Sequence, residues 1–306
     1  MSPARADCGS QKRTGSEAIP KSHSPITSAL RRIALCTLLL PLAASANEGP
    51  PPDPFGISLD GAVGIPQGYV QVRENNRKGT RLSLHGDLGI DTVETVALDA
   101  AYHFCANDAV GLDFDTIFLY GSKRLRGDVL FNGALLQGGT TAESRPDFFR
   151  LTGLWEHRLW EVPGGGRLLS DFGFTYVMLE YKLNATLSPR SAGSETKEDF
   201  LTQELPVPMI GLSLEQPISD HVSFVGSALG GYLPQVDSLR NEGGDVKLSQ
   251  SHADAFAKLR YHVTPNFDVE AGYAFHYFNQ REASREDGNY FKLWHNDLKI
   301  GLAYRF

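Results

Sequence analysis

The sequence predicts an all-β protein, a closed antiparallel transmembrane β-barrel of about twelve strands, with ten as the alternative. Its last nine residues place Leu298, Ile300, Leu302, Tyr304 and Phe306 on one face and polar or small residues on the other. This period of two is that of a strand, because a helix would scatter the same residues around its axis. Similar alternation recurs between tight turns and long polar loops, and a secretory leader precedes it.

The predicted leader covers residues 1–46. Arg31 and Arg32 precede an apolar stretch at 33–44, which is too short to span a bilayer as a helix, and small residues at 44–46 suit cleavage. A retained signal anchor is the alternative. Residues 47–54 are predicted to be a Pro-rich linker, and residues 55–306 the barrel domain.

Composition excludes several classes of protein. The leader takes six of the 29 basic and two of the 36 acidic side chains, which leaves a net charge of about −11 and a poor nucleic-acid binder. Cys105 is then the only cysteine, so no intramolecular disulfide is expected. No second apolar stretch suits a membrane helix, so a spanning chain must close its sheet, since open edges in hydrocarbon leave backbone groups unpaired.

The spacing of turns and loops predicts the topology. Tight turns at 105–108, 162–166, 217–220 and 264–266 alternate with long stretches at 122–146, 184–208, 231–247 and 279–289. Barrels place short turns in the periplasm and long loops outside, and both termini share the periplasm only when the strand number is even. The predicted strands are 55–64, 67–74, 80–90, 94–104, 109–121, 147–160, 167–183, 209–217, 220–230, 248–263, 267–278 and 290–306. The first two are the weakest, because glycines and Pro66 interrupt them.

The hairpin around residues 264–266 predicts its own register. If paired residue numbers sum to 530, apolar side chains share the outer face and charged ones the inner face. A slip of one residue would send every charge into lipid. The resulting inward pairs form a predicted lumen polar network: Asp254 with His276, Arg260 with Glu270, and His262 with Asp268.

Three other segments show the same division into faces. The predicted lipid-facing residues are Val96, Leu98, Tyr102, Phe104, Leu112, Phe114, Phe118 and Tyr120, together with Leu82, Leu84, Leu88 and Ile90. The acidic residues on the opposite face of these segments predict an inward stripe of Asp87, Asp99, Asp113 and Asp115. Such a stripe suggests a cation-selective constriction. The alternative is a salt-bridge network neutralised by arginine, for which Arg150 is one candidate.

No catalytic residue, metal site or cofactor is predicted. Asp254 opposite His276 has the arrangement of an oriented general base, but Ser249 and Ser251 lie on the other face of their strand. A polar pair that holds two strands in register is therefore the favoured interpretation. No HExxH or CxxC spacing supports a metal site.

The C-terminal strand resembles that of bacterial outer-membrane β-barrel proteins. In that class the closing Phe is implied to be part of the signal read by the barrel-assembly machinery, which makes Tyr304 and Phe306 candidate signal residues. The resemblance implies export through the periplasm, integration into the outer membrane of a Gram-negative cell, and outer-membrane lipids and lipopolysaccharide as partners. Lys123, Arg124 and Arg126 are candidate contacts for lipopolysaccharide phosphates.

The expected function is that of a porin-like pore or channel for small solutes. The alternatives are a barrel hydrolase that modifies lipids or lipopolysaccharide and a structural or adhesive surface barrel. Hydrolases of this class are implied to carry a His followed two residues later by Ser on a lipid-facing strand surface. None of the nine histidines is expected to have Ser at that position, so the resemblance to these hydrolases fails.

A soluble β-sandwich is the competing fold, since it would bury the apolar strand faces against one another. A barrel should instead migrate differently on a gel before and after boiling, once extracted with detergent. A protein that stays in solution without detergent would contradict the barrel.

Overall fold

The computed structural model describes residues 54–73, 77–191, 197–198, 205–237, 246–284 and 288–306. Backbone contacts divide the chain into the units Met1–Asn47 and Glu48–Phe306. The predicted leader, with Cys8 and Cys36, lies outside the described residues, as does the linker up to residue 53. No helix in the described ranges is long and apolar enough to cross a bilayer.

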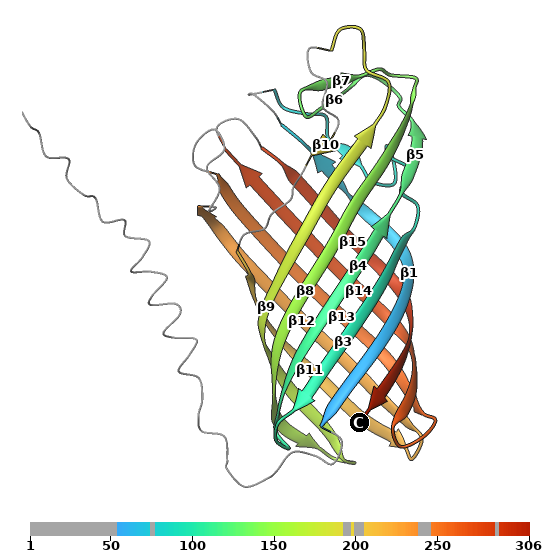
Figure 1. Ribbon diagram of the computed structural model, residues 1–306, viewed down its shortest axis with the longest axis vertical. Helices are drawn as coiled ribbons and strands as arrows, with labels where there is room; N and C mark the ends of the chain where they lie inside the picture. Colours follow the sequence, from blue (N-terminus) through green and yellow to red (C-terminus); the bar gives the residue numbers. More distant parts are fainter. Residues whose placement is uncertain (1–53, 74–76, 192–196, 199–204, 238–245, 285–287) are drawn as a thin grey trace, which may run out of the picture. The chain divides into compact units, whose positions relative to one another are not determined.

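Ten antiparallel strands form a closed ring (Figure 1). In ring order they are β1 (Phe55–Gln71), β3 (Val93–His103), β4 (Asp108–Leu119), β8 (Thr141–Val162), β9 (Gly166–Asn184), β11 (Val207–Ser219), β12 (Val222–Asp237), β13 (Lys247–His262), β14 (Phe267–Ala283) and β15 (Tyr290–Arg305). Five short strands lie outside the ring: β2 (Leu82–Ser83), β5 (Gly121–Arg124), β6 (Val129–Phe131), β7 (Ala134–Leu136) and β10 (Lys197–Glu198). The fold is therefore the predicted closed antiparallel barrel.

The first and last strands make the seam of the ring. β1 and β15 pair along their whole length, from Gly56 opposite Arg305 to Gln71 opposite Tyr290. At the chain end, the amide of Phe306 donates to the carbonyl of Phe55 at 2.9 Å, and the amide of Phe55 donates back at 3.2 Å. The ring thus has no unpaired edge at the seam, as a barrel in hydrocarbon requires.

The count of twelve strands is wrong and the alternative of ten is right, for a reason the sequence did not reveal. The predicted strands 55–64 and 67–74 are replaced by one strand, β1, which runs through Pro66 to Gln71 and includes Gly68 at a φ of +138°. A Cβ at Gly68 would lie 1.9 Å from the carbonyl oxygen of Lys292, so only glycine fits there. Residues 80–90 form no spanning strand and contribute only β2 to the sheet.

The outer wall carries the predicted apolar side chains. Leu298 and Ile300 of β15 are 72% and 67% exposed. The predicted lipid-facing residues of β3 and β4, and Phe104 and Tyr120 beside them, are likewise exposed. So many large apolar side chains on one continuous surface are not compatible with a soluble protein, and they match the lipid-facing band of a transmembrane barrel.

The two ends of the barrel differ (Figure 1). At the short-turn end, the connections are 104–107, 163–165, 220–221 and 263–266, close to the predicted turns. At the long-loop end lie β5, the β6–β7 hairpin and β10. Several strands extend further toward this end than the sequence suggested; β8, for example, begins at Thr141 rather than at residue 147.

Inward side chains change from polar to apolar along the barrel axis. On β9 they are Asp171 and Thr175 toward the short-turn end, followed by Leu179 and Tyr181 toward the long-loop end. Leu179 and Tyr181 are fully buried, and the Tyr181 hydroxyl shares a 2.7 Å hydrogen bond with Ser144. The interior of the long-loop half is therefore filled mainly by apolar side chains, with Gln250, His252 and Gln280 as a buried hydrogen-bonded group beside them.

Loop segments complete this core, which we call the apolar plug. Wall strands contribute Phe148, Val177, Leu179, Tyr181, Phe278, Phe291 and Leu293, and loop segments contribute Leu82, Leu84, Leu88, Ile90, Leu125, Phe131 and Leu136. The prediction that Leu82, Leu84, Leu88 and Ile90 face lipid is wrong: these side chains are at most 3% exposed. Residues 80–90 fold inward as a turn, so their apolar face meets the plug.

Aromatic rings of the plug touch across the barrel. Phe148 of β8 contacts Phe278 of β14 edge to face, with ring centroids 4.9 Å apart. Tyr181 of β9 lies 6.3 Å from Phe291 of β15. Each pair joins strands that are five steps apart in the ring of ten, that is, on opposite walls. Opposite walls that touch leave no open lumen at this level.

The outer band yields a test of the membrane assignment. Ile300→Arg should lower the free energy of unfolding in lipid vesicles by about 2–4 kcal/mol, because it places a guanidinium in hydrocarbon near the middle of the band. Ile300→Leu is the matched control and should change little. Denaturant titration of folded protein measures both, and an Ile300→Arg protein as stable as Ile300→Leu would contradict a lipid-facing position.

Candidate functional site

A polar cavity of about 350 Å³ occupies the interior toward the short-turn end, and we call it the vestibule. Its lining begins at the turn that contains Asn107, near Arg305, and reaches inward to Arg150 and His276. Beyond this level Phe148 and Phe278 begin the apolar plug. Charged residues of both signs line the vestibule, so it is suited to a small polar or charged ligand.

Arg150 of β8 joins carboxylates from two other strands at the inner end of the vestibule. Its guanidinium donates to Asp115 of β4, at 2.7 Å from Nε, and to Asp254 of β13, at 2.8 Å from Nη1. Asp254 also accepts a hydrogen bond from His276 at 2.7 Å. All of these side chains are mostly buried. β8 and β13 lie four steps apart in the ring, so this cluster also spans the interior.

The predicted register of the β13–β14 hairpin is confirmed. Asp254 lies opposite His276, Arg260 opposite Glu270, and His262 opposite Asp268. Each pair forms an ion pair or a hydrogen bond: Arg260 Nε lies 2.6 Å from Glu270, and His262 Nδ1 lies 2.7 Å from Asp268. Lys258 also binds Glu270. The predicted lumen polar network therefore exists, and it holds neighbouring strands together.

The predicted acidic stripe is only partly assembled. Asp99 and Asp113 lie opposite each other on β3 and β4, and the Ser58 hydroxyl donates to Asp99 at 2.7 Å. Asp115 is neutralised by Arg150, as the salt-bridge alternative expected. Asp87 does not belong to the stripe. It lies in the turn after β2, where its carboxylate accepts the amide hydrogen of Ser83 at 2.9 Å.

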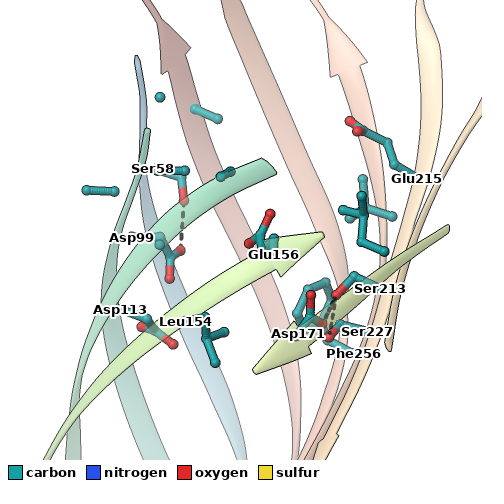
Figure 2. Close-up of a pocket in the computed structure, with 18 of the residues that line it drawn as sticks. Ser58, Asp99, Asp113, Leu154, Glu156, Asp171, Ser213, Glu215, Ser227 and Phe256 are labelled. Carbon is teal, nitrogen blue, oxygen red and sulfur yellow. Dashed lines mark hydrogen bonds between the residues drawn. The ribbon is translucent and has the colours of Figure 1, made fainter. Parts of the chain in front are cut away.

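Figure 2 shows a second acidic group, which the sequence analysis did not single out. Glu156 of β8 lies opposite Asp171 of β9 in the vestibule lining. Ser213 donates to Oδ2 of Asp171 at 2.6 Å and lies 3.0 Å from the hydroxyl of Ser227. The Oδ1 atom of Asp171 has no hydrogen-bond partner among the described residues. This side of the vestibule is therefore acidic.

The structure brings Ser223 of β12 to the predicted pair of His262 and Asp268. Ser223 Oγ lies 2.9 Å from His262 Nε2, on the opposite side of the ring from Asp268. The expectation that no histidine has Ser two positions later is wrong, because His221 precedes Ser223 by the spacing implied for barrel hydrolases. Ser223 is only 5% exposed and faces inward, so it does not supply the lipid-facing arrangement of that class.

The two candidate assembly-signal residues lie on the outer wall at the seam. Tyr304 and Phe306 are about half exposed, and their rings are 5.7 Å apart. Phe306 also packs against Phe55 at 4.8 Å. In the described part of the chain, no three His, Cys, Asp or Glu side chains are grouped so that they could hold a metal ion.

The Arg150 cluster yields a stability test. Arg150→Met leaves Asp115 and Asp254 buried without their cation, so the free energy of unfolding should fall by about 3–5 kcal/mol. Arg145→Met is the control, because the Arg145 side chain is 67% exposed and, among the described residues, forms its ion pair with Asp147; its loss should be below about 1 kcal/mol. Equal small losses in a denaturant titration would show that the buried cluster is not a stabilising centre.

Comparison with protein-family models and with curated proteins gives no match. Solved structures similar to this chain are bacterial outer-membrane β-barrel proteins. The outer membrane protease OmpT from Escherichia coli is 13% identical, with a TM-score of 0.49 over 82% of this chain and 97% of that chain. The outer membrane protein OprG from Pseudomonas aeruginosa is 13% identical, with a TM-score of 0.33 over 84% and 98%. The translocator domain of autotransporter NalP from Neisseria meningitidis is 14% identical, with a TM-score of 0.37 over 94% and 100%.

Proposed function

We propose that this chain is an integral outer-membrane barrel with a closed interior, which anchors and displays the loops at its long-loop end. The contacts between opposite walls carry this proposal. Phe148 meets Phe278, and Tyr181 meets Phe291, within a plug built from buried apolar side chains. A small solute needs a continuous polar path, and this plug interrupts it. The short-turn end then faces the periplasm, and the long-loop end faces the cell exterior.

A pore for small solutes is the second candidate, because the vestibule supplies half of a polar path. Ten strands lie between about eight, whose interior side chains can fill, and about sixteen, which leave a channel. Conduction would require the turn at 84–90 and the β6–β7 hairpin to leave the barrel together. That movement would expose Leu84, Leu88, Ile90, Phe131 and Leu136, all of them fully buried, at an energetic cost that favours the closed form.

Lipopolysaccharide is the proposed lipid partner of the outer wall at the long-loop end. Lys292 of β15 lies over the rings of Tyr277 and Trp294, at 5.2 and 5.1 Å from their centroids. On the neighbouring strand β1, the ring of Tyr69 lies beneath Arg81, whose guanidinium carbon is 3.3 Å from the ring centroid. Cations beside aromatic rings, just beyond an apolar band, suit the phosphates at the interface of the outer leaflet.

Lys123 and Arg124, two of the three basic residues proposed from the sequence, lie in β5 at the same end. Both also bond within the protein: Lys123 to the carbonyl of His85 and Arg124 to that of Gly139. They are therefore weaker candidates for lipid phosphates than Lys292. The barrel-assembly machinery remains the proposed partner of Tyr304 and Phe306, whose exposed rings at the seam are accessible from the lipid side. The anchoring role uses no catalytic residue and no cofactor.

Planar-bilayer recording tests the closed interior. We expect purified protein to leave the bilayer sealed at all voltages, whereas Phe148→Ser with Phe278→Ser should produce conductance, because it removes the contact between opposite walls. Phe118→Ser is the control, since Phe118 is 49% exposed on the outer wall. Regular conductance steps from the unmodified protein would overturn the closed barrel and favour the pore.

A further inference from the structure

Three neighbouring strands bring a serine, a histidine and an aspartate into one hydrogen-bonded chain. Ser223 is the second residue of β12, His262 the last of β13, and Asp268 the second of β14. Ser223 Oγ lies 2.9 Å from His262 Nε2, and Asp268 Oδ1 lies 2.7 Å from His262 Nδ1. The two contacts use different ring nitrogens, so the imidazole lies between the hydroxyl and the carboxylate.

The surroundings of Asp268 define the direction of each hydrogen bond. Arg305 lies 3.3 Å from its carboxylate, and Arg260 lies 3.8 Å from it. An ionised carboxylate only accepts hydrogen bonds. His262 must therefore carry its proton on Nδ1, and the free lone pair on Nε2 accepts the hydrogen bond from Ser223. This is the protonation pattern that a nucleophilic serine requires.

The other aspartate-bound histidines inside the barrel lack a hydroxyl partner. Nδ1 of His276 faces Asp254, and its Nε2 faces Asp297 at 3.9 Å. His295 is bonded to Asp297 through Nδ1. Within the described ranges, no serine or threonine hydroxyl is hydrogen-bonded to the ring of either histidine. The hydroxyl is thus a particular feature of His262, rather than a general property of histidines in the polar network.

The three residues lie at the short-turn end, where His262 is more exposed than Ser223, which is 5% exposed. His262 directly precedes the turn between β13 and β14, and its side chain is 22% exposed. Asp268, Arg260 and Arg305 belong to the lining of the vestibule, whose volume is about 350 Å³. A cavity of this size limits the ligand to a small molecule.

We propose that Ser223, His262 and Asp268 form a catalytic triad that hydrolyses small carboxylic esters entering from the short-turn end. This activity is additional to the anchoring role and does not depend on whether the interior conducts. Ser223 is the nucleophile and His262 the general base. Asp268 is a positioning residue, which holds the imidazole in the required tautomer.

The reaction proceeds in two balanced stages. Ser223 Oγ bonds to the ester carbonyl carbon as its proton moves to His262 Nε2; the bond to the alcohol oxygen then breaks, and the imidazolium protonates the departing alkoxide. Water next attacks the acyl carbon and gives its proton to Nε2. The bond from carbon to Ser223 Oγ breaks, and Oγ recovers the proton. The products are one carboxylic acid and one alcohol, and no other reactant is needed.

Labelling with a fluorophosphonate, a serine-directed electrophile, tests the proposal on full-length folded protein in detergent micelles. We expect one adduct per chain, located on the peptide that contains Ser223 by mass spectrometry. An adduct elsewhere, or none, would overturn the triad. This measurement needs no variant, so a folding defect cannot obscure it.

Variants then assign the roles, with heat-modifiable migration as the check on folding. Ser223→Ala should abolish both labelling and the hydrolysis of p-nitrophenyl butyrate. Asp268→Asn should slow labelling by about 10²–10⁴-fold and alter its dependence on pH. Ser251→Ala is the control, because Ser251 lies on the other face of β13 and outside the vestibule lining, where Asn279 donates to it at 3.4 Å; it should label at the normal rate. A folded Ser223→Ala protein that reacts like the unmodified protein would sink the proposal.

Discussion

Every backbone amide and carbonyl of the wall must find a partner within the wall itself, and the seam between β1 and β15 meets this constraint. In hydrocarbon no water can satisfy an open strand edge, so a ten-stranded sheet is stable there only as a ring. The pairing from Gly56 opposite Arg305 to Gln71 opposite Tyr290 closes that ring along its full length. The apolar outer wall, the polar vestibule and the plug all exist as separate surfaces because this closure defines an inside and an outside.

The two halves of the barrel interior are filled by different kinds of side chain. Toward the short-turn end, charges are arranged so that cations lie between carboxylates, as Arg150 does between Asp115 and Asp254. Toward the long-loop end, aromatic and aliphatic side chains from loops and walls pack together as they do in a soluble core. The first arrangement leaves the vestibule open, while the second fills the interior. The polar cavity and the closed section therefore occupy opposite halves of one barrel.

The sequence was sufficient wherever local alternation and a tight turn occur together. The turn at residues 264–266 fixes the β13–β14 register, and so it predicts the contacts of Arg260 with Glu270 and of His262 with Asp268. Alternation alone could not say what an apolar face touches, so Leu84 and Leu88 were assigned to lipid although they lie in the plug. The inward position of Asp87 failed for the same reason, since its segment is a turn and not a strand.

The partner of His262 could not be predicted in this way. Ser223 and His262 are brought together by the pairing of β12 with β13, whose register shifts between Leu233 and Val236 before a long loop. No short turn fixes that register, so the pairing follows from the geometry of the whole ring. The spacing of His221 and Ser223 was a local signal, but by itself it would have suggested a lipid-facing site.

The pair of backbone hydrogen bonds between Phe55 and Phe306 has a consequence for biogenesis. The two strands that close the ring come from opposite ends of the domain, so a partly synthesised barrel cannot close. The contact that closes the sheet is also the one with the greatest separation in sequence. Such distant contacts form slowly. Until β15 pairs with β1, the sheet has two unpaired edge strands that can pair with any exposed strand of another chain. The chain therefore depends on protection from aggregation throughout its passage to the membrane.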